Sequence, residues 1–86
     1  MNTKVALYNR FKTEVIDKME QGDVITRNQI MYQMNVSDML VDRLMYYIKH
    51  NLCREGFNKN VMISHEGFRV EFQKLKRSTK MYIIKI

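Results

Sequence analysis

The sequence predicts an α+β domain in which three helices precede a small antiparallel β-sheet. Up to about residue 50, apolar residues recur every three or four positions, as they do in amphipathic helices. Beyond Gly56 the pattern changes to alternation, with Phe68, Val70 and Phe72 separated by polar residues. The chain has 86 residues and no proline, so we expect a single domain over residues 1–86.

The first helix is expected over residues 3–20, where apolar side chains form one stripe at helical spacing. The stripe consists of Leu7, Tyr8, Phe11, Val15 and Met19. Gly22 suits the left-handed residue that often follows a helix. Val24 and Ile25 then predict a short extended segment.

The second helix is expected over residues 26–34, where Thr26 and Gln29 have the spacing of a capping box. In that motif each side chain accepts a hydrogen bond from the backbone amide of the other residue. The apolar positions of this helix are Ile30, Met31 and Met34. Asn35 follows them, and asparagine tolerates the positive φ of a tight turn.

The third helix is expected over residues 37–50, with Ser37 as its N-cap. Asp38 lies in the first turn, where the helix dipole favours a negative charge. The spacing places Val41, Leu44 and Ile48 on the inward face. An outward stripe consists of Met39, Arg43, Tyr46 and His50, and a neighbouring stripe of Asp38, Asp42 and Lys49.

The remaining chain predicts strands over residues 61–64, 68–75 and 81–86, separated by "HEG" and "KRSTK". We expect Cys53 to be a small buried residue that follows the third helix. The residues predicted to form the core are Phe11, Val15, Ile30, Val41, Leu44, Ile48 and Phe72.

The positive charge is concentrated in the C-terminal part of the sequence. The chain carries a formal net charge of +6, with a pI near 9.6. Residues 54–86 hold eight basic and three acidic residues, a net +5, which leaves +1 for the first 53 residues.

Four cations, Lys74, Lys76, Arg77 and Lys80, surround the last predicted turn. Such clustering is typical of a phosphate-binding surface. The alternative is a solvated turn whose lysines prevent edge-to-edge aggregation.

The turn between the second and third helices resembles that of the winged helix-turn-helix superfamily. Met34, Asn35 and Val36 match its sequence of an apolar residue, a turn residue and an apolar residue. Ser37 matches the capping residue that begins the recognition helix of the family. The family more often has Gly at the turn position, and it has a small residue, usually Ala, where this chain has Met31.

The resemblance covers residues 24–86 and is most specific over residues 25–52. It implies a third helix in the major groove of double-stranded DNA, and a basic hairpin on the phosphate backbone or in the minor groove. The residues expected to contact nucleic acid are Arg27, Asn28, Ser37, Met39, Arg43, Tyr46, Lys49, Lys74, Lys76, Arg77 and Lys80.

The outward stripe has side chains that suit base and phosphate contacts. Arg43 can donate two hydrogen bonds to the O6 and N7 of guanine, and Met39 can contact a thymine methyl group. Tyr46 and His50 can reach phosphates. The alternative for Arg43 is a surface ion pair with Asp38 or Asp42, which would contribute little.

Residues for catalysis or metal binding are few. One cysteine and two histidines, Cys53, His50 and His65, are a poor set for zinc, which needs about four ligands in a structural site. A nuclease that uses both histidines and the basic turn is a minority interpretation, because no phosphate loop, nucleophile elbow or paired-carboxylate motif is present. We therefore expect no enzyme activity, no metal and no cofactor.

A single cysteine and the lack of a long apolar run predict a cytoplasmic protein without a membrane span.

Two functional hypotheses follow. The first is a small DNA-binding protein that acts as a transcriptional or replication accessory regulator, similar in style to compact phage or mobile-element regulators. One short recognition helix reads few base pairs, so a homodimer or a partner is expected. The second is a protein-binding module of the same fold, which docks on a host protein or on a second copy. Its apolar patch would consist of Met39, Leu40, Met45 and Tyr46.

Overall fold

The computed structural model describes residues 3–55, 60–64 and 66–86, and these form an α+β fold. The helical elements are α1 (Thr3–Glu14), the 3₁₀ turn η1 (Ile16–Lys18), α2 (Arg27–Met34) and α3 (Asp38–Asn51). The strands are β1 (Val24–Thr26), β2 (Cys53–Glu55), β3 (Val61–Ser64), β4 (Phe68–Lys74) and β5 (Thr79–Lys85). The α+β class and the three helices are confirmed.

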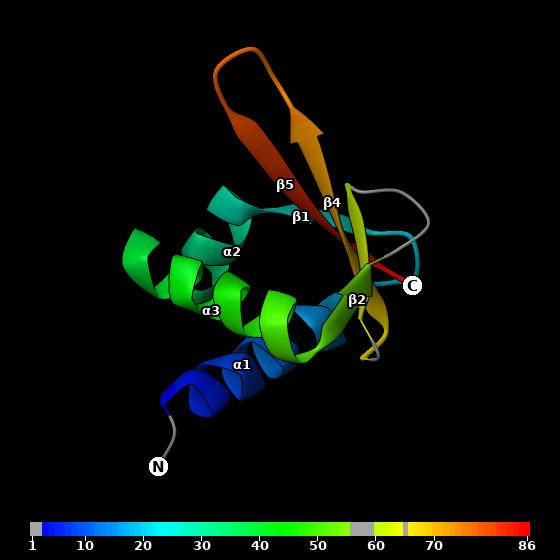
Figure 1. The fold of residues 1–86 in the computed structure, drawn as a ribbon. Coiled ribbons are helices and arrows are strands. Elements are labelled where there is room, and N and C mark those ends of the chain that lie inside the picture. Colours follow the sequence, from blue (N-terminus) through cyan, green and yellow to red (C-terminus); the bar gives the residue numbers. More distant parts are fainter. Residues whose placement is uncertain (1–2, 56–59, 65) are drawn as a thin grey trace.

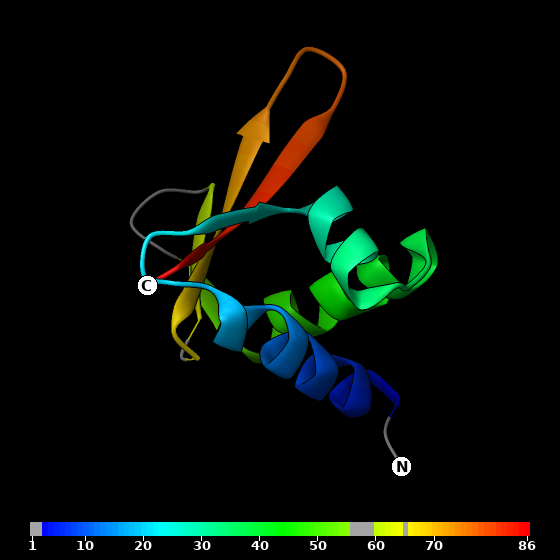
Figure 2. The same ribbon diagram turned by 180° about the vertical axis from the view of Figure 1, so that it is seen from behind.

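One antiparallel sheet contains the described strands, in the order β1-β5-β4-β3-β2. Four of its strands follow α3, where three were predicted. The predicted extended segment at Val24 and Ile25 forms β1, which precedes α2 and pairs with β5. Strand β2 was not predicted, and β5 begins at Thr79, two residues before the expected position. The helices lie together on one side of the sheet (Figures 1 and 2).

The predicted first helix is too long, because α1 ends at Glu14. Val15 and Ile16 are adjacent and both fully buried, so the chain tightens at this point to place both side chains in the core. The following amides of Lys18 and Met19 donate to the carbonyls three residues earlier, at 3.2 and 3.1 Å. Gly22 has the expected positive φ of 89°, but its amide donates to Lys85 of β5 and does not end a helix.

The predicted turn between the second and third helices is confirmed. Both hydrogen bonds of the capping box join Thr26 and Gln29 at the start of α2. Asn35 ends α2 with a φ of 53°, in the left-handed region. The Ser37 hydroxyl accepts a hydrogen bond from the amide of Leu40 and so caps α3. The two helices are therefore separate elements joined by a tight turn.

The core lies between the helices and the sheet. Phe11 and Phe68 meet edge to face, with their ring centroids 5.8 Å apart, and six of the seven predicted core residues are buried. Phe72 is the exception, because it is only partly buried. Along β4 burial falls toward Lys74, since this end of the hairpin extends beyond the helices (Figure 1).

The β4–β5 hairpin projects from the body of the molecule (Figures 1 and 2). Its strands pair from Phe68 opposite Lys85 to Lys74 opposite Thr79. The amide of Leu75 donates to the carbonyl of Ser78 at 2.8 Å and closes the turn. None of the described helices is long and apolar enough to cross a membrane.

Candidate nucleic-acid surface

The outward stripe of α3 is exposed along its whole length, as predicted. Met39 and Tyr46 are each 59% exposed, and Arg43 and His50 are also exposed. Among the described residues, Arg43 forms no ion pair, so its guanidinium can meet a ligand. It lies beside the start of α1, where it lines a shallow hollow with Lys4.

Aromatic contacts order the middle of this stripe. The rings of Tyr46 and His50 are 4.1 Å apart between centroids and inclined by 37°. Lys4, from the first turn of α1, places its Nζ 5.6 Å from the centroid of the Tyr46 ring. Sequence reasoning did not find Lys4, because its contact depends on how α1 crosses α3. These contacts hold two potential phosphate donors and a cation together on the outer surface of α3.

The two aspartates of α3 bind an arginine from α2. The guanidinium of Arg27 donates to the carboxylates of Asp38 and Asp42 and to the backbone carbonyl of Asp38 at 3.0 Å. The Asp38 and Asp42 side chains are 74% and 70% exposed, whereas that of Arg27 is 29% exposed. Hydrogen bonding to Asp38, and then to Asp42, raises the pKa of Arg27. We call these three residues the arginine–aspartate cluster.

The cluster changes how the aspartates are interpreted. The alternative that Arg43 pairs with them is wrong, because Arg27 takes that position. Arg27 also joins α2 to α3 across the tight turn. The cluster carries one positive and two negative charges, so it presents a net charge of −1 at the beginning of α3.

The four cations of the last predicted turn are exposed on the projecting hairpin. Lys74 ends β4, Lys76 and Arg77 lie in the turn, and Lys80 is near the start of β5. No ion pair among the described residues includes any of the four, and residues 72–86 contain no acidic residue. The hairpin therefore presents four uncompensated positive charges.

The structure brings together some of the predicted contact residues and separates others. Arg27 and Asn28 of α2 and Lys80 near the start of β5 line the same cleft of about 270 Å³. Lys49 lies on the flank of α3 that faces the sheet. Ser37 is exposed, but its hydroxyl already caps α3.

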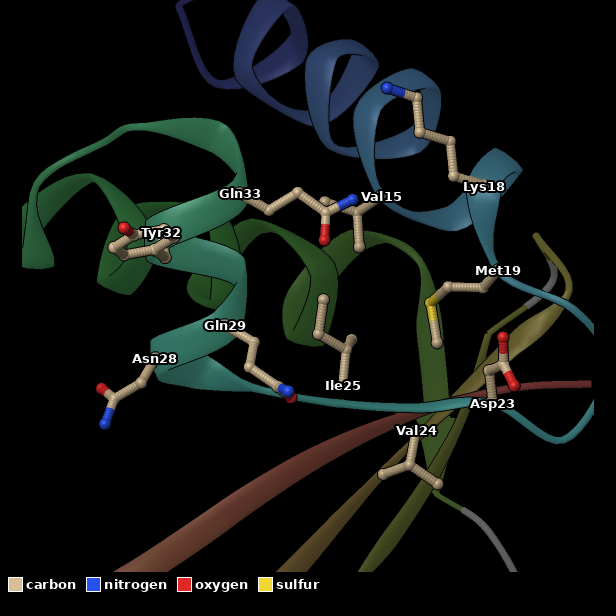
Figure 3. Close-up of a pocket in the computed structure, with 10 residues that line it drawn as sticks. All are labelled: Val15, Lys18, Met19, Asp23, Val24, Ile25, Asn28, Gln29, Tyr32 and Gln33. Atoms are coloured by element: carbon tan, nitrogen blue, oxygen red, sulfur yellow. The ribbon is translucent and has the colours of Figure 1, made fainter.

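A separate hollow lies between α2, β1 and η1 (Figure 3). It is an open groove of about 740 Å³, and none of its ten labelled lining residues is a His, Cys or Ser. The Gln29 side chain accepts from the amide of Thr26 at 2.8 Å, and Gln33 donates to the carbonyl of Glu14 at 2.7 Å. The side chains of Gln29 and Gln33 in this groove therefore already bind the backbone. Among the lining residues, no hydroxyl or amine nucleophile is hydrogen-bonded to a general base.

Residues suited to metal binding do not gather in the described part of the chain, where no three His, Cys, Asp or Glu side chains form a candidate site. His65 lies outside the described residues. Cys53 is in β2, after α3 as expected, but it is only partly buried where a buried residue was expected. Burial nevertheless raises the pKa of its thiol to about 11, which keeps the thiol protonated near neutral pH.

Comparison with known proteins gives no match, whether to protein-family models, to curated proteins or to solved structures. The exposed charges and contacts of the chain are therefore the basis for a functional proposal.

Proposed function

We propose that the protein binds double-stranded DNA in the manner of a winged helix-turn-helix protein, as a transcriptional or replication accessory factor. The observation that carries the proposal is the hairpin with four exposed cations, Lys74, Lys76, Arg77 and Lys80. Phosphates attract such a cluster regardless of DNA sequence, and each contact releases counterions from the duplex. The projection of the hairpin supports the same function, because it lets the tip reach the DNA backbone beyond the body.

In this proposal α3 lies in the major groove. Arg43 reads guanine through two hydrogen bonds, and Met39 contacts a thymine methyl group. Tyr46 and His50 contact phosphates and fix the position of the helix. The exposure of the stripe, and the absence of an ion pair of Arg43 with any residue that the structure describes, support these roles.

The arginine–aspartate cluster limits the repulsion between α3 and DNA. Free carboxylates at the beginning of the helix would repel phosphate, but Arg27 binds both of them. A net charge of −1 remains at this end of α3. The attraction to DNA is therefore assigned to the hairpin, and the recognition of bases to the outward stripe.

A salt titration with random duplex DNA tests the proposal. A fluorescent duplex is titrated with the protein at several salt concentrations, and anisotropy reports the dissociation constant. We expect log affinity to fall linearly with log salt, with a slope of about −0.9 for each phosphate contact. Binding that is absent at low salt, or that does not depend on salt, would contradict DNA binding.

The second candidate function is docking on a protein, favoured by the exposed apolar side chains of Met39 and Tyr46 on α3. The partner would be a host protein or a second copy of the chain. Separate Met39→Ala and Arg43→Ala variants distinguish the two functions. A DNA reader depends more on Arg43, whereas an apolar protein interface depends more on Met39. For either function we propose a cytoplasmic location, because a lone cysteine suits a reducing compartment.

A further inference from the structure

A pocket of about 230 Å³ lies between α3 and the sheet. Its lining includes Met45, Ile48, Cys53, Met62, Phe72 and Met81. Five of these six are only partly buried, although they pack against the core. Apolar surface is therefore left open to solvent at this point, and three of the lining side chains are flexible thioethers that adapt to a ligand.

The charged residues on the rim of the pocket are not equivalent. Asp42 and Lys49 both line it from α3. The Asp42 carboxylate accepts a hydrogen bond from Arg27, but Arg27 also binds Asp38, so the charge of Asp42 is compensated only in part. Lys49 is exposed and takes part in no ion pair among the described residues. Among the described residues, a ligand entering the pocket thus meets apolar walls, the unpaired cation of Lys49 and the partly compensated carboxylate of Asp42.

We propose that this pocket binds a small amphipathic anion. The apolar body of the ligand fills the space between the thioethers and Phe72, and its carboxylate meets the Nζ of Lys49. A cavity of roughly 150 Å³ holds benzene, so a pocket of about 230 Å³ has room for one ring with a short chain. The ligand proposal does not rest on DNA binding, although Lys49 and Tyr46, which are also expected to contact DNA, line the pocket.

Three probes that differ only in their head group test the ligand class. Phenylpropanoate, phenylpropanol and phenylpropylamine are each titrated into protein with isotope-labelled methionine methyl groups, and NMR follows the methyl signals. We expect saturable shifts at Met45, Met62 and Met81, with no shift at Met39 on the outward stripe. The anion should bind about tenfold more tightly than the alcohol, as expected for one charge-assisted hydrogen bond, and the amine should bind most weakly.

Two charge variants test the role of Lys49. Lys49→Met keeps an apolar stem and removes the cation, so the affinity for phenylpropanoate should fall about tenfold while that for phenylpropanol stays unchanged. Lys18→Met is the matched control, because Lys18 is also exposed but lines a different groove. It should bind all three probes like the unaltered protein.

Cys53, the single cysteine of the chain, gives an independent measurement, since phenylpropanoate in the pocket should slow its alkylation by a maleimide.

Equal affinity for the three probes, or an unchanged affinity in Lys49→Met, would overturn the assignment of an anion. Shifts that never saturate, or that include Met39 equally, would overturn the pocket itself as a ligand site.

Discussion

The cations of the hairpin allow the sharpest test of the DNA proposal. Changing Lys74, Lys76, Arg77 and Lys80 together to Ala removes four exposed positive charges. If two or three of them contact phosphate, the slope of log affinity against log salt should flatten by roughly 2 to 3 units. Between about 50 and 200 mM salt, the unaltered protein would then lose about 10- to 40-fold more affinity than the variant. Fluorescence anisotropy with a random duplex measures both slopes.

The fold should survive these four changes. The turn is closed by the backbone hydrogen bond from Leu75 to Ser78, which needs none of the altered side chains. Exposed substitutions of this kind usually change stability by about 0.5 kcal/mol or less each. Circular dichroism and a thermal transition close to that of the unaltered protein would establish that the variant is folded.

A matched pair of double variants separates the position of the charges from their number. Lys76→Ala with Arg77→Ala removes two charges from the hairpin tip, whereas Lys18→Ala with Lys85→Ala removes two far from the tip, one in η1 and one at the opposite end of the hairpin. Only the first pair should flatten the salt slope by about one to two units. A slope that is unchanged in the folded quadruple variant would remove the hairpin from the DNA proposal and favour the protein-binding function.

Four further results are expected. Asp42→Asn should strengthen binding to random DNA in anisotropy, because it removes a negative charge and loosens the hold on Arg27; weaker binding would mean that Asp42 contacts a base or a partner. Arg43→Ala should weaken a preferred site, found by selection from a random duplex pool, more than random DNA, and equal losses would contradict base reading. Phe11→Ala, at a fully buried ring, should lower the free energy of unfolding in urea by about 3 to 5 kcal/mol. Tyr8→Phe should leave the free energy of unfolding unchanged or raise it by about 1 kcal/mol, since the buried Tyr8 hydroxyl has no hydrogen-bond partner among the described residues. A clear loss of stability in the same urea assay would show that the hydroxyl does form a hydrogen bond.

The features that the sequence predicted well are those set by short-range chemistry. The capping box of Thr26 and Gln29, the left-handed Asn35 and the Ser37 cap all involve residues at most three apart. Their hydrogen bonds form within one turn of the chain, so residue type and spacing are sufficient to predict them. The exposed stripe of α3 was predictable for the same reason, because helical periodicity alone orients its side chains.

The features that the sequence did not predict depend on distant contacts. The extended segment at Val24 and Ile25 was predicted, but its pairing with β5 as strand β1 was not, because three residues alone do not indicate a distant partner. The Arg27 contacts to Asp38 and Asp42 join residues 11 and 15 positions apart. An arginine can reach many carboxylates across a turn, so only the packing of α2 on α3 selects these two.

The distribution of charge also predicts that attraction and recognition can be separated by mutation. α3 contains two acidic residues, Asp38 and Asp42, and two basic ones, Arg43 and Lys49, so it has no net formal charge of its own. Screening limits attraction between exposed charges to about 8 to 10 Å at physiological salt. The four cations Lys74, Lys76, Arg77 and Lys80 of the projecting hairpin take part in no ion pair among the described residues. Hairpin variants should therefore weaken all duplexes alike, whereas a change at Arg43 should alter the preference between duplexes. A protein that bound DNA through α3 alone would show the opposite behaviour, because its salt dependence would follow Arg43 and leave the hairpin variants unaffected.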